Sequence, residues 1–308
     1  MKYIYGPVPS RRLGLSLGID IIPPKHCTLS CIYCQLGKTP HITIEHHEYI
    51  PAEKVLEELK ELLHRGVKTD WITFAGSGEP TLHSGLGSMI RNVKSLTDIP
   101  VCVITNGTLL WDPCVQKELL GADAVLPSLD SAVEQTFQDI CHPHRDLSIV
   151  EIIDGLVQFR KEYSGKILLE ILFVKGLNDS QKELEHLRDA VKKIKPDEVH
   201  LNTVVRPPAE NSAEPLSREQ LEEIRDYFGK NTVIIAEFKT DSARHAHAGI
   251  NEIKEYLKRR PGSLVDISTA LGINENEAKK MLERLTECGE VVRRNYLRKD
   301  YWEYPGKS

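Results

Sequence analysis

The 308-residue sequence has no run of 18 or more apolar residues, so it offers no hydrophobic transmembrane helix. Its first residues, MKYIYGPVPS, lack the apolar segment of a secretory signal. It also lacks a basic excess: residues 1–249 hold 28 Lys and Arg against 35 Asp and Glu, and residues 250–308 hold 12 against 10. We therefore expect a cytoplasmic protein without membrane contact or extended nucleic-acid binding, although a local site for an RNA end stays open.

Cysteine is sparse, and its distribution is uneven. Of seven cysteines, three lie close together at Cys27, Cys31 and Cys34, and four are scattered. A reducing cytoplasm keeps thiols free, which argues against a disulfide framework and for metal binding or catalysis. Cys141, in the segment CHPH, is either a hydrogen-atom donor or metal ligand, or else a loop thiol beside capping histidines.

Short apolar strands alternate with amphipathic helical patterns between residues 13 and 236. This alternation predicts βα units around a parallel sheet, and hence an α/β fold with a partial (β/α)6 TIM-like barrel. The six predicted strands are 13–22, 71–75, 101–105, 124–129, 167–174 and 198–204, with a further strand at 232–238. Capping boxes are predicted at helix starts for Ser148 with Glu151, Ser180 with Glu183 and Ser217 with Gln220.

The C-terminal residues follow a polar stretch at 239–249 and have a different pattern. Helices are predicted at 250–259, 264–271 and 275–288, followed by a strand pair within 291–304. That order suggests a small winged-helix domain, so we expect a barrel domain at 1–248 and a winged-helix-like domain at 249–308. Arginines on the predicted wing favour nucleic acid, whereas the mixed charge of the third helix suits a protein or peptide partner equally well.

The strongest chemical signal is the motif Cys27-x-x-x-Cys31-x-x-Cys34, directly after the first predicted strand. Three thiolates in this short loop can ligate three irons of a 4Fe-4S cluster and leave the fourth iron open. The alternative is a zinc site completed by His26, because three cysteines and one histidine are a common zinc set. Polar or glycine-rich loops follow all six strands, and in a barrel such loops meet at one mouth, where active sites lie.

With these motifs, the chain resembles the radical S-adenosylmethionine (SAM) superfamily over roughly residues 13–236. The resemblance implies an enzyme whose 4Fe-4S cluster, held by Cys27, Cys31 and Cys34, cleaves SAM reductively. The resulting 5'-deoxyadenosyl radical would abstract hydrogen from a substrate. An electron donor of the flavodoxin or ferredoxin type is the implied partner. The segments that carry the resemblance, besides the cysteine motif, are GSGEP at 76–80, TNG at 105–107, SLD at 128–130 and KGLN at 175–178.

The same resemblance implies a set of SAM contacts. Tyr33 would lean on the adenine, and the GSGEP segment would approach the SAM amino group, with Ser77 standing where the family pattern has glycine. The remaining loops occupy positions where the family binds the methionine carboxylate, the ribose and the adenine. The implied cofactor-binding residues are Tyr33, Gly76, Ser77, Gly78, Glu79, Asn106, Ser128, Asp130 and Asn178.

Within the superfamily, the segments GPVPSRRLGLSLGID, IYCQLG, GSGEPTL, TNGTLL and PSLD are most similar to the wyosine-base (tRNA imidazoguanosine) synthases and their relatives. Those synthases build a second cluster from cysteines upstream of the radical motif. This chain has no cysteine before Cys27, so their tRNA reaction is not carried over. A tRNA nucleotide, a peptide or protein side chain and a small metabolite all stay open as substrates.

Several basic residues are further candidates for the substrate site. Arg11 and Arg12 precede the first predicted strand and would bind a phosphate or carboxylate, or else be solvated surface arginines. Arg206 follows the sixth strand and would form a substrate wall or a rigid exit turn. The alternative functions are an iron-sulfur-sensing winged-helix regulator that binds DNA without catalysis, and a zinc-stabilised adaptor.

Overall fold

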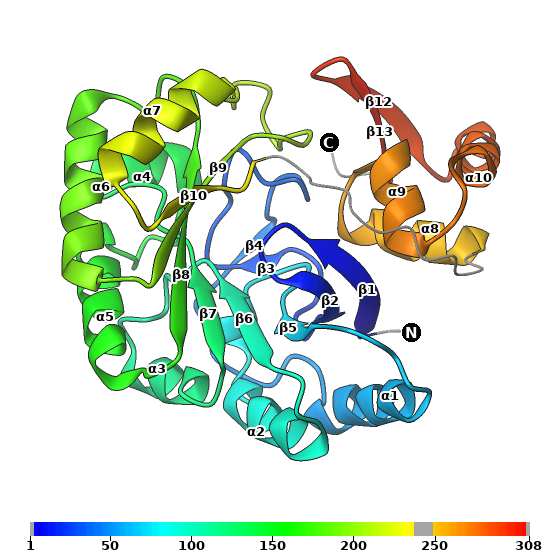
Figure 1. Cartoon of the computed structure of the whole chain (residues 1–308), viewed down its shortest axis with the longest axis horizontal. Coiled ribbons are helices and arrows are strands. Elements are labelled where there is room, and N and C mark those ends of the chain that lie inside the picture. Colours follow the sequence, from blue (N-terminus) through cyan, green and yellow to red (C-terminus); the bar gives the residue numbers. More distant parts are fainter. Residues whose placement is uncertain (1–2, 237–248, 306–308) are drawn as a thin grey trace.

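The computed structural model describes residues 3–236 and 249–305. An eight-stranded sheet of order β1-β2-β5-β6-β7-β8-β9-β10 curves into an open barrel with helices on its outer face (Figure 1). All neighbouring strands in it are parallel except β1, which pairs antiparallel with β2. The strands are β1 (Ile4–Ser10), β2 (Gly14–Ile19), β5 (Trp71–Phe74), β6 (Val101–Thr105), β7 (Ala124–Pro127), β8 (Lys166–Phe173), β9 (Glu198–Thr203) and β10 (Thr232–Ile234).

Amphipathic helices connect the parallel strands. In α1 the buried residues Val55, Leu59 and Leu62 recur at helical spacing, which places one apolar stripe against the sheet. The predicted α/β fold with a TIM-like barrel is confirmed. The helices are α1 (Ala52–His64), η1 (Pro80–Leu82), α2 (Leu86–Leu96), α3 (Pro113–Leu119), α4 (Glu134–Cys141), α5 (Ile149–Glu162), α6 (Gln181–Ile194) and α7 (Arg218–Phe228), and two short strands, β3 (His26–Cys27) and β4 (His41–Ile42), pair beside the barrel.

The structure departs from the sequence prediction at several places. Strand β1 was not predicted, because Pro7 and Pro9 interrupt its pattern; proline is tolerated there since β1 is an edge strand. The first predicted strand ends at Ile19, three residues early. The strand predicted at 232–238 is β10, which ends at Ile234; residues 237–238 and the expected linker at 239–248 lie outside the described residues.

Two of the three predicted helix caps use their serine. Ser217 forms the complete capping box, and the Ser180 side chain accepts a hydrogen bond from the Glu183 amide. The box predicted at Ser148 is wrong: its side chain makes no cap bond, and the Glu134 carboxylate instead accepts from the Ile149 amide at 3.0 Å. The N-terminus of α5 is therefore capped by Glu134 and not by Ser148.

Residues 250–303 form a C-terminal unit of three helices and a three-stranded antiparallel sheet. Its own apolar core includes Ile253, Leu257, Leu282 and Trp302. In the described part of the chain, no helix is long and apolar enough to span a membrane. The elements of the unit are α8 (Ile250–Arg259), β11 (Gly262–Ser263), α9 (Leu264–Leu271), α10 (Glu275–Glu287), β12 (Val292–Tyr296) and β13 (Lys299–Glu303).

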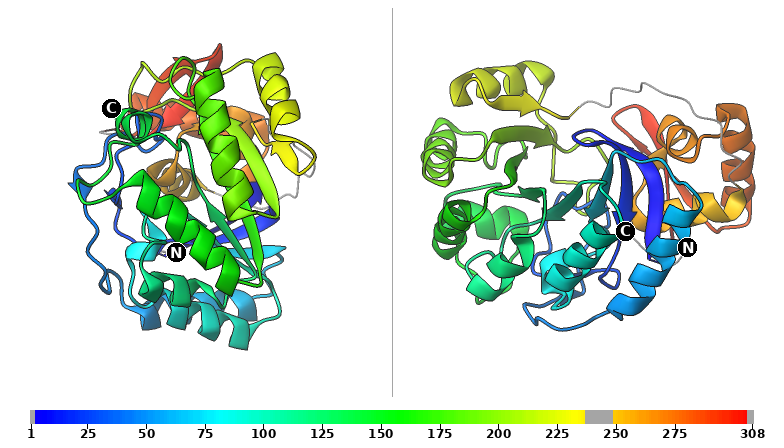
Figure 2. Two further views of the ribbon diagram at one scale, coloured as in Figure 1. Left: turned by 90° about the vertical axis from the view of Figure 1, so that its left-hand side faces the viewer. Right: turned by 60° about the horizontal axis from the view of Figure 1, so that its bottom comes forward.

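The C-terminal unit contacts the edge strand β1 and the loop after β9. On one edge α9 packs against β1, and the Arg259 guanidinium lies 5.0 Å from the ring centroid of Tyr5. Figure 2 shows the unit alongside this edge. On the other side, the Tyr296 and Tyr301 hydroxyls donate to the carbonyl oxygens of Val204 and Val205, at 3.1 and 3.0 Å, in the loop after β9. The unit therefore contacts the barrel at one edge strand and at one loop of its mouth.

Candidate active site

The cysteine loop, residues 27–34, lies at the carboxyl end of β2 and is held by backbone hydrogen bonds to α4. The Ser30 amide donates to the Cys141 carbonyl at 3.0 Å, and the Ile32 amide donates to the Ile140 carbonyl at 2.9 Å. Cys27, Cys31 and Cys34 are partly exposed and are not joined in disulfides. Burial raises the pKa of Cys27, and the negative charges of Glu79 and the neighbouring thiolates raise it further. Three thiolates this close together call for positively charged partners.

The donor set fits the ligands of a 4Fe-4S cluster better than a zinc site. Among the described residues, no group of three Cys, His, Asp or Glu side chains converges on a single metal position. Zinc draws all its ligands around one ion, whereas a cubane spreads three thiolates over three irons. His26, the fourth ligand of the zinc alternative, is engaged elsewhere: its ring stacks on His41 at 4.7 Å, and its Nδ1 lies 3.3 Å from the Pro24 carbonyl oxygen.

Glu79 ties the loop after β5 to the loop after β6. Its carboxylate accepts hydrogen bonds from the Thr81 amide and hydroxyl at 3.0 and 2.7 Å, from the Thr105 hydroxyl at 2.6 Å and from the Asn106 amide at 2.7 Å. The residue is only 2% exposed. Burial raises its pKa, and these hydrogen bonds oppose the shift. Because all four donors belong to the chain, the Glu79 side chain acts by positioning Asn106.

Asn106 joins the β6 loop to the first cysteine. Its Nδ2 donates to the Thr28 hydroxyl at 2.7 Å and lies 3.5 Å from Cys27 Sγ. Its Oδ1 accepts from the amide and hydroxyl of Thr108 at 3.0 and 2.7 Å, which fixes the orientation of the amide. Asn106 therefore lies directly beside the cysteine loop.

The glycines of the GSGEP segment allow close backbone packing. A Cβ on Gly76 would lie 2.2 Å from the Asp20 carboxyl carbon, and a Cβ on Gly78 would lie 2.2 Å from the His26 carbonyl oxygen. Ser77 donates from its amide and its hydroxyl to Asp20 Oδ2, at 3.1 and 2.6 Å. Asp20 is a site residue that was not predicted. Its signal in the sequence is its position directly after β2, at the same barrel edge as the other loops.

Tyr33 donates a hydrogen bond to Oδ2 of the buried Asp130, across the mouth from the cysteine loop. Asp130 Oδ1 accepts from the Leu172 amide at 2.8 Å, and the Cys141 thiol lies 3.9 Å from Oδ2. Burial raises the pKa of Asp130 to about 6, and the hydrogen bonds from Tyr33 and Leu172 oppose this shift. The interpretation of Cys141 as a loop thiol is wrong, because it ends α4 and is buried.

Asn178 was expected to contact SAM through its side chain, but in the structure this side chain bonds to the protein backbone. It is fully buried, and its Nδ2 donates to the carbonyl oxygens of Asp130 at 2.7 Å and Leu172 at 2.9 Å, while its Oδ1 accepts from the Val174 amide at 2.8 Å. With both amide hydrogens used inside the chain, Asn178 holds the loop after β7 against the loop after β8. Ser128 belongs to the same region, where its amide donates to the Thr105 carbonyl at 3.1 Å.

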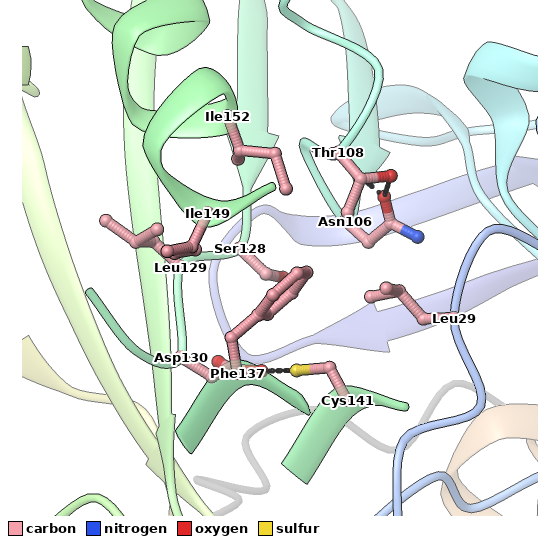
Figure 3. A pocket seen from close by; sticks show the side chains of 10 residues that line it. All are labelled: Leu29, Asn106, Thr108, Ser128, Leu129, Asp130, Phe137, Cys141, Ile149 and Ile152. Carbon is pink, nitrogen blue, oxygen red and sulfur yellow. Dashed lines mark hydrogen bonds between the residues drawn. The ribbon is translucent and has the colours of Figure 1, made fainter. Parts of the chain in front are cut away.

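The loops after β6 and β7 enclose a small cavity of about 10 Å³ (Figure 3). Asn106, Thr108, Ser128 and Asp130 form its polar side. Its apolar side comes from α4, α5, the cysteine loop and the loop after β7, and Figure 3 shows the Phe137 ring between Ser128 and Cys141. A volume of this size holds about one water molecule. The apolar side is formed by Leu29, Leu129, Phe137, Cys141, Ile149 and Ile152.

Comparison with known proteins agrees with this geometry. The model of the radical SAM superfamily matches residues 21–191. The chain is 40% identical over 294 residues to a protein named GTPase Obg from Brachyspira hyodysenteriae, covering 94% of this chain but only 43% of that protein. It is 34% identical over 296 residues to a UPF0026 protein from Helicobacter pylori strain J99, covering 95% and 94% of the two chains.

A solved structure shares the fold at low identity. The radical SAM methyltransferase from Sphaerobacter thermophilus superimposes with a TM-score of 0.55 at 16% identity, covering 71% of this chain and 65% of that one. Since the family model covers more than half of the residues, the chain belongs to the radical SAM superfamily. It is a radical SAM enzyme, and its cofactors are a 4Fe-4S cluster and SAM. Enzymes of this class also need a reductant.

Proposed function

We propose that Cys27, Cys31 and Cys34 ligate the 4Fe-4S cluster, and that the enzyme abstracts hydrogen from a substrate at the barrel mouth. When bound, the cluster and SAM supply the electron and the 5'-deoxyadenosyl radical. The observation that carries this assignment is the connection from Cys27 through Asn106 to Glu79, which joins the cysteine loop to the loops after β5 and β6. A chain that used the cysteines only for structure would not need these loops to meet beside them.

The SAM contacts follow from the same arrangement. The backbone of Gly76, Ser77 and Gly78 would receive the amino group, and Asn106 would orient the methionine carboxylate. Ser128 and Asp130 lie on the polar side of the cavity and suit the ribose hydroxyls. Other residues act through their neighbours: Glu79 positions Asn106 and Asn178 positions the Asp130 loop, while Tyr33 would lean on the adenine.

Residues 249–308 are proposed to form a winged-helix-like domain that follows a barrel domain at 1–248. The order of three helices and three antiparallel strands in 250–303 supports this assignment. An electron donor of the flavodoxin or ferredoxin type is the proposed reductant. Resemblance to the wyosine-base group supports a nucleotide-containing substrate, whereas the lack of cysteines before Cys27 argues against the second-cluster reaction of that group.

The assignment is tested on protein purified anaerobically and reconstituted with iron and sulfide. With SAM and a strong reductant, mass spectrometry should detect 5'-deoxyadenosine, and Cys31→Ala should abolish both the brown chromophore and the product. Cys114→Ala is the matched control, because Cys114 is exposed on α3, and it should change neither. A chromophore that survives Cys31→Ala overturns the ligand assignment. An intact cluster without 5'-deoxyadenosine would favour the regulator alternative.

A further inference from the structure

A lysine occupies a turn position that usually takes glycine, just before the cysteine loop. The His26 amide donates to the Pro23 carbonyl oxygen at 3.2 Å and closes a four-residue turn. Lys25 is the third residue of this turn, and its φ of 64° lies in the left-handed region. With a proline at the second position, this φ is that of a type II turn, whose third residue is usually Gly or Asn. A lysine kept in so unfavourable a backbone conformation points to a role for its side chain.

The Lys25 side chain joins the two ends of the cysteine loop. Its Nζ donates a hydrogen bond to the Gly37 carbonyl oxygen. Lys25 stands just before Cys27 in the sequence, and Gly37 stands just after Cys34. The Gly37 amide donates to the Cys34 carbonyl oxygen at 3.0 Å, which keeps the acceptor of the lysine beside the third cysteine. The ammonium group is therefore anchored at the segment that is proposed to hold the cluster.

The backbone around Lys25 is fixed from the opposite side by the GSGEP segment. The Lys25 amide donates to the Ser77 carbonyl oxygen at 2.8 Å, and the Glu79 amide donates to the His26 carbonyl oxygen at 3.0 Å. The Lys25 residue as a whole is half-buried. Its backbone is thus held by the loop after β5, while its ammonium is held by Gly37.

The charge of Lys25 acts on the cysteines themselves. Burial lowers the pKa of Lys25, and the negative charges of Cys34 and Cys27 oppose this shift. In the same place, burial and then the charge of Glu79 raise the pKa of Cys27. Lys25 therefore supplies a positive charge at a loop where the thiolates and the buried Glu79 carboxylate gather negative ones.

Resting on the proposed function, we infer that Lys25 raises the reduction potential of the bound cluster. The three thiolates outweigh the positive charge of the cluster core, and one further negative charge arrives when the cluster is reduced by its electron donor. A fixed ammonium stabilises this more negative, reduced form more than the oxidised form. Net charge is one of the properties that set the potential of a cluster. The lysine thus makes the cluster easier to reduce.

The test measures the midpoint potential of the reconstituted cluster without SAM, by redox titration followed by electron paramagnetic resonance. Lys25→Met removes the charge, so the ratio of reduced to oxidised cluster at a fixed potential should fall about tenfold, a shift of about 59 mV to lower potential. Lys25→Arg keeps the charge and should stay near the parent. Lys38→Met is the matched control, because that side chain is 73% exposed and pairs with Glu210, and it should leave the potential unchanged. An unchanged potential in Lys25→Met would overturn the inference.

A glycine variant separates the charge from the folding of the turn. Lys25→Gly removes the same charge as Lys25→Met, but glycine suits the left-handed position. If the charge sets the potential, both variants should shift it equally, although Lys25→Gly should have the higher melting temperature. A larger shift in Lys25→Met, in step with its lower melting temperature, would show a structural role only and would overturn the inference.

The titration does not depend on SAM cleavage, so this inference and the proposed catalysis fail separately. A cluster that supports 5'-deoxyadenosine formation but keeps its potential in Lys25→Met refutes this inference alone. A cluster whose potential shifts as expected, in a parent enzyme that forms no 5'-deoxyadenosine with SAM and a strong reductant, refutes the proposed catalysis alone.

Discussion

Arg206 donates a hydrogen bond from Nη1 to Oε1 of Gln35, across 171 positions of sequence. The contact joins the loop after β9 to the residue that follows the third cysteine. The same loop bonds to Tyr296 and Tyr301 of the C-terminal unit through the Val204 and Val205 carbonyls. One short loop therefore connects the cysteine loop to the C-terminal unit.

Gln35→Leu should destabilise the enzyme, because the substitution removes an acceptor from the half-buried guanidinium of Arg206. Hydrogen bonds to charged groups contribute about 1.5–3 kcal/mol, so we expect the free energy of unfolding to fall by about 2 kcal/mol. Urea unfolding under anaerobic conditions measures the change. Gln138→Leu removes a comparable hydrogen bond on the exposed face of α4 and should cost less than about 1 kcal/mol. Equal losses for the two variants would contradict the prediction.

Glu79→Gln should weaken both folding and SAM binding. Both carboxylate oxygens accept from donors of the chain, so the amide NH₂ would face a donor in place of an acceptor. We expect a loss of about 1–3 kcal/mol in the free energy of unfolding and a higher Kd for SAM in equilibrium dialysis. Glu53→Gln, on the exposed first turn of α1, is the control and should change neither value.

Asp130 predicts a specific dependence of stability on pH. Its pKa is about 6 in the folded protein against 3.8 for the unperturbed group, so the folded state binds more protons between these values. The free energy of unfolding should therefore fall as pH rises from about 4 to about 6, by about 3 kcal/mol at most. In Asp130→Asn this contribution should be missing, while Asp139→Asn, on the exposed face of α4, should keep it. Urea unfolding at a series of pH values compares the three proteins.

Gly76→Ala should disrupt the proposed SAM amino-group site. The added methyl group would lie 2.2 Å from the Asp20 carboxyl carbon, so either the loop after β5 or Asp20 must move. Since Asp20 holds Ser77 by two hydrogen bonds, we expect about a tenfold or greater loss of SAM affinity. Gly121→Ala is milder, because its nearest neighbour is a side-chain methyl of Ile90 at 3.3 Å, and its SAM affinity should stay near that of the parent.

The sequence predicted the barrel well because its strands are short apolar runs bounded by turn residues. β6, for example, has the predicted ends, Val101 and Thr105. The sequence-based prediction was wrong where a side chain from a distant part of the chain determines the local hydrogen bonding. Ser148 lost its cap to Glu134, and Asn178, expected to face the cofactor, is turned inward by the carbonyls of Asp130 and Leu172. A hydrogen-bond partner that is distant in sequence cannot be identified from the residues around a single motif.

In the candidate site, too, local motifs were predicted and long-range contacts were not. Polar loops after the strands were expected from residue types, and their SAM contacts from the resemblance to the superfamily; the structure brings Asn106 and Cys27 together. Asp20 was missed because the first strand was predicted to run to residue 22, which placed Asp20 inside the strand, whereas β2 ends at Ile19.

The last prediction concerns how the C-terminal unit is held. Tyr296→Phe with Tyr301→Phe removes the two hydroxyls that bind the loop after β9 while keeping the rings. Each hydrogen bond contributes about 1 kcal/mol, so residues 204–211 should exchange amide hydrogen about tenfold faster or more. Tyr304→Phe, whose ring contacts Lys258, is the control and should leave exchange in the loop unchanged. Faster exchange confined to the C-terminal unit would show that these hydroxyls do not hold the loop.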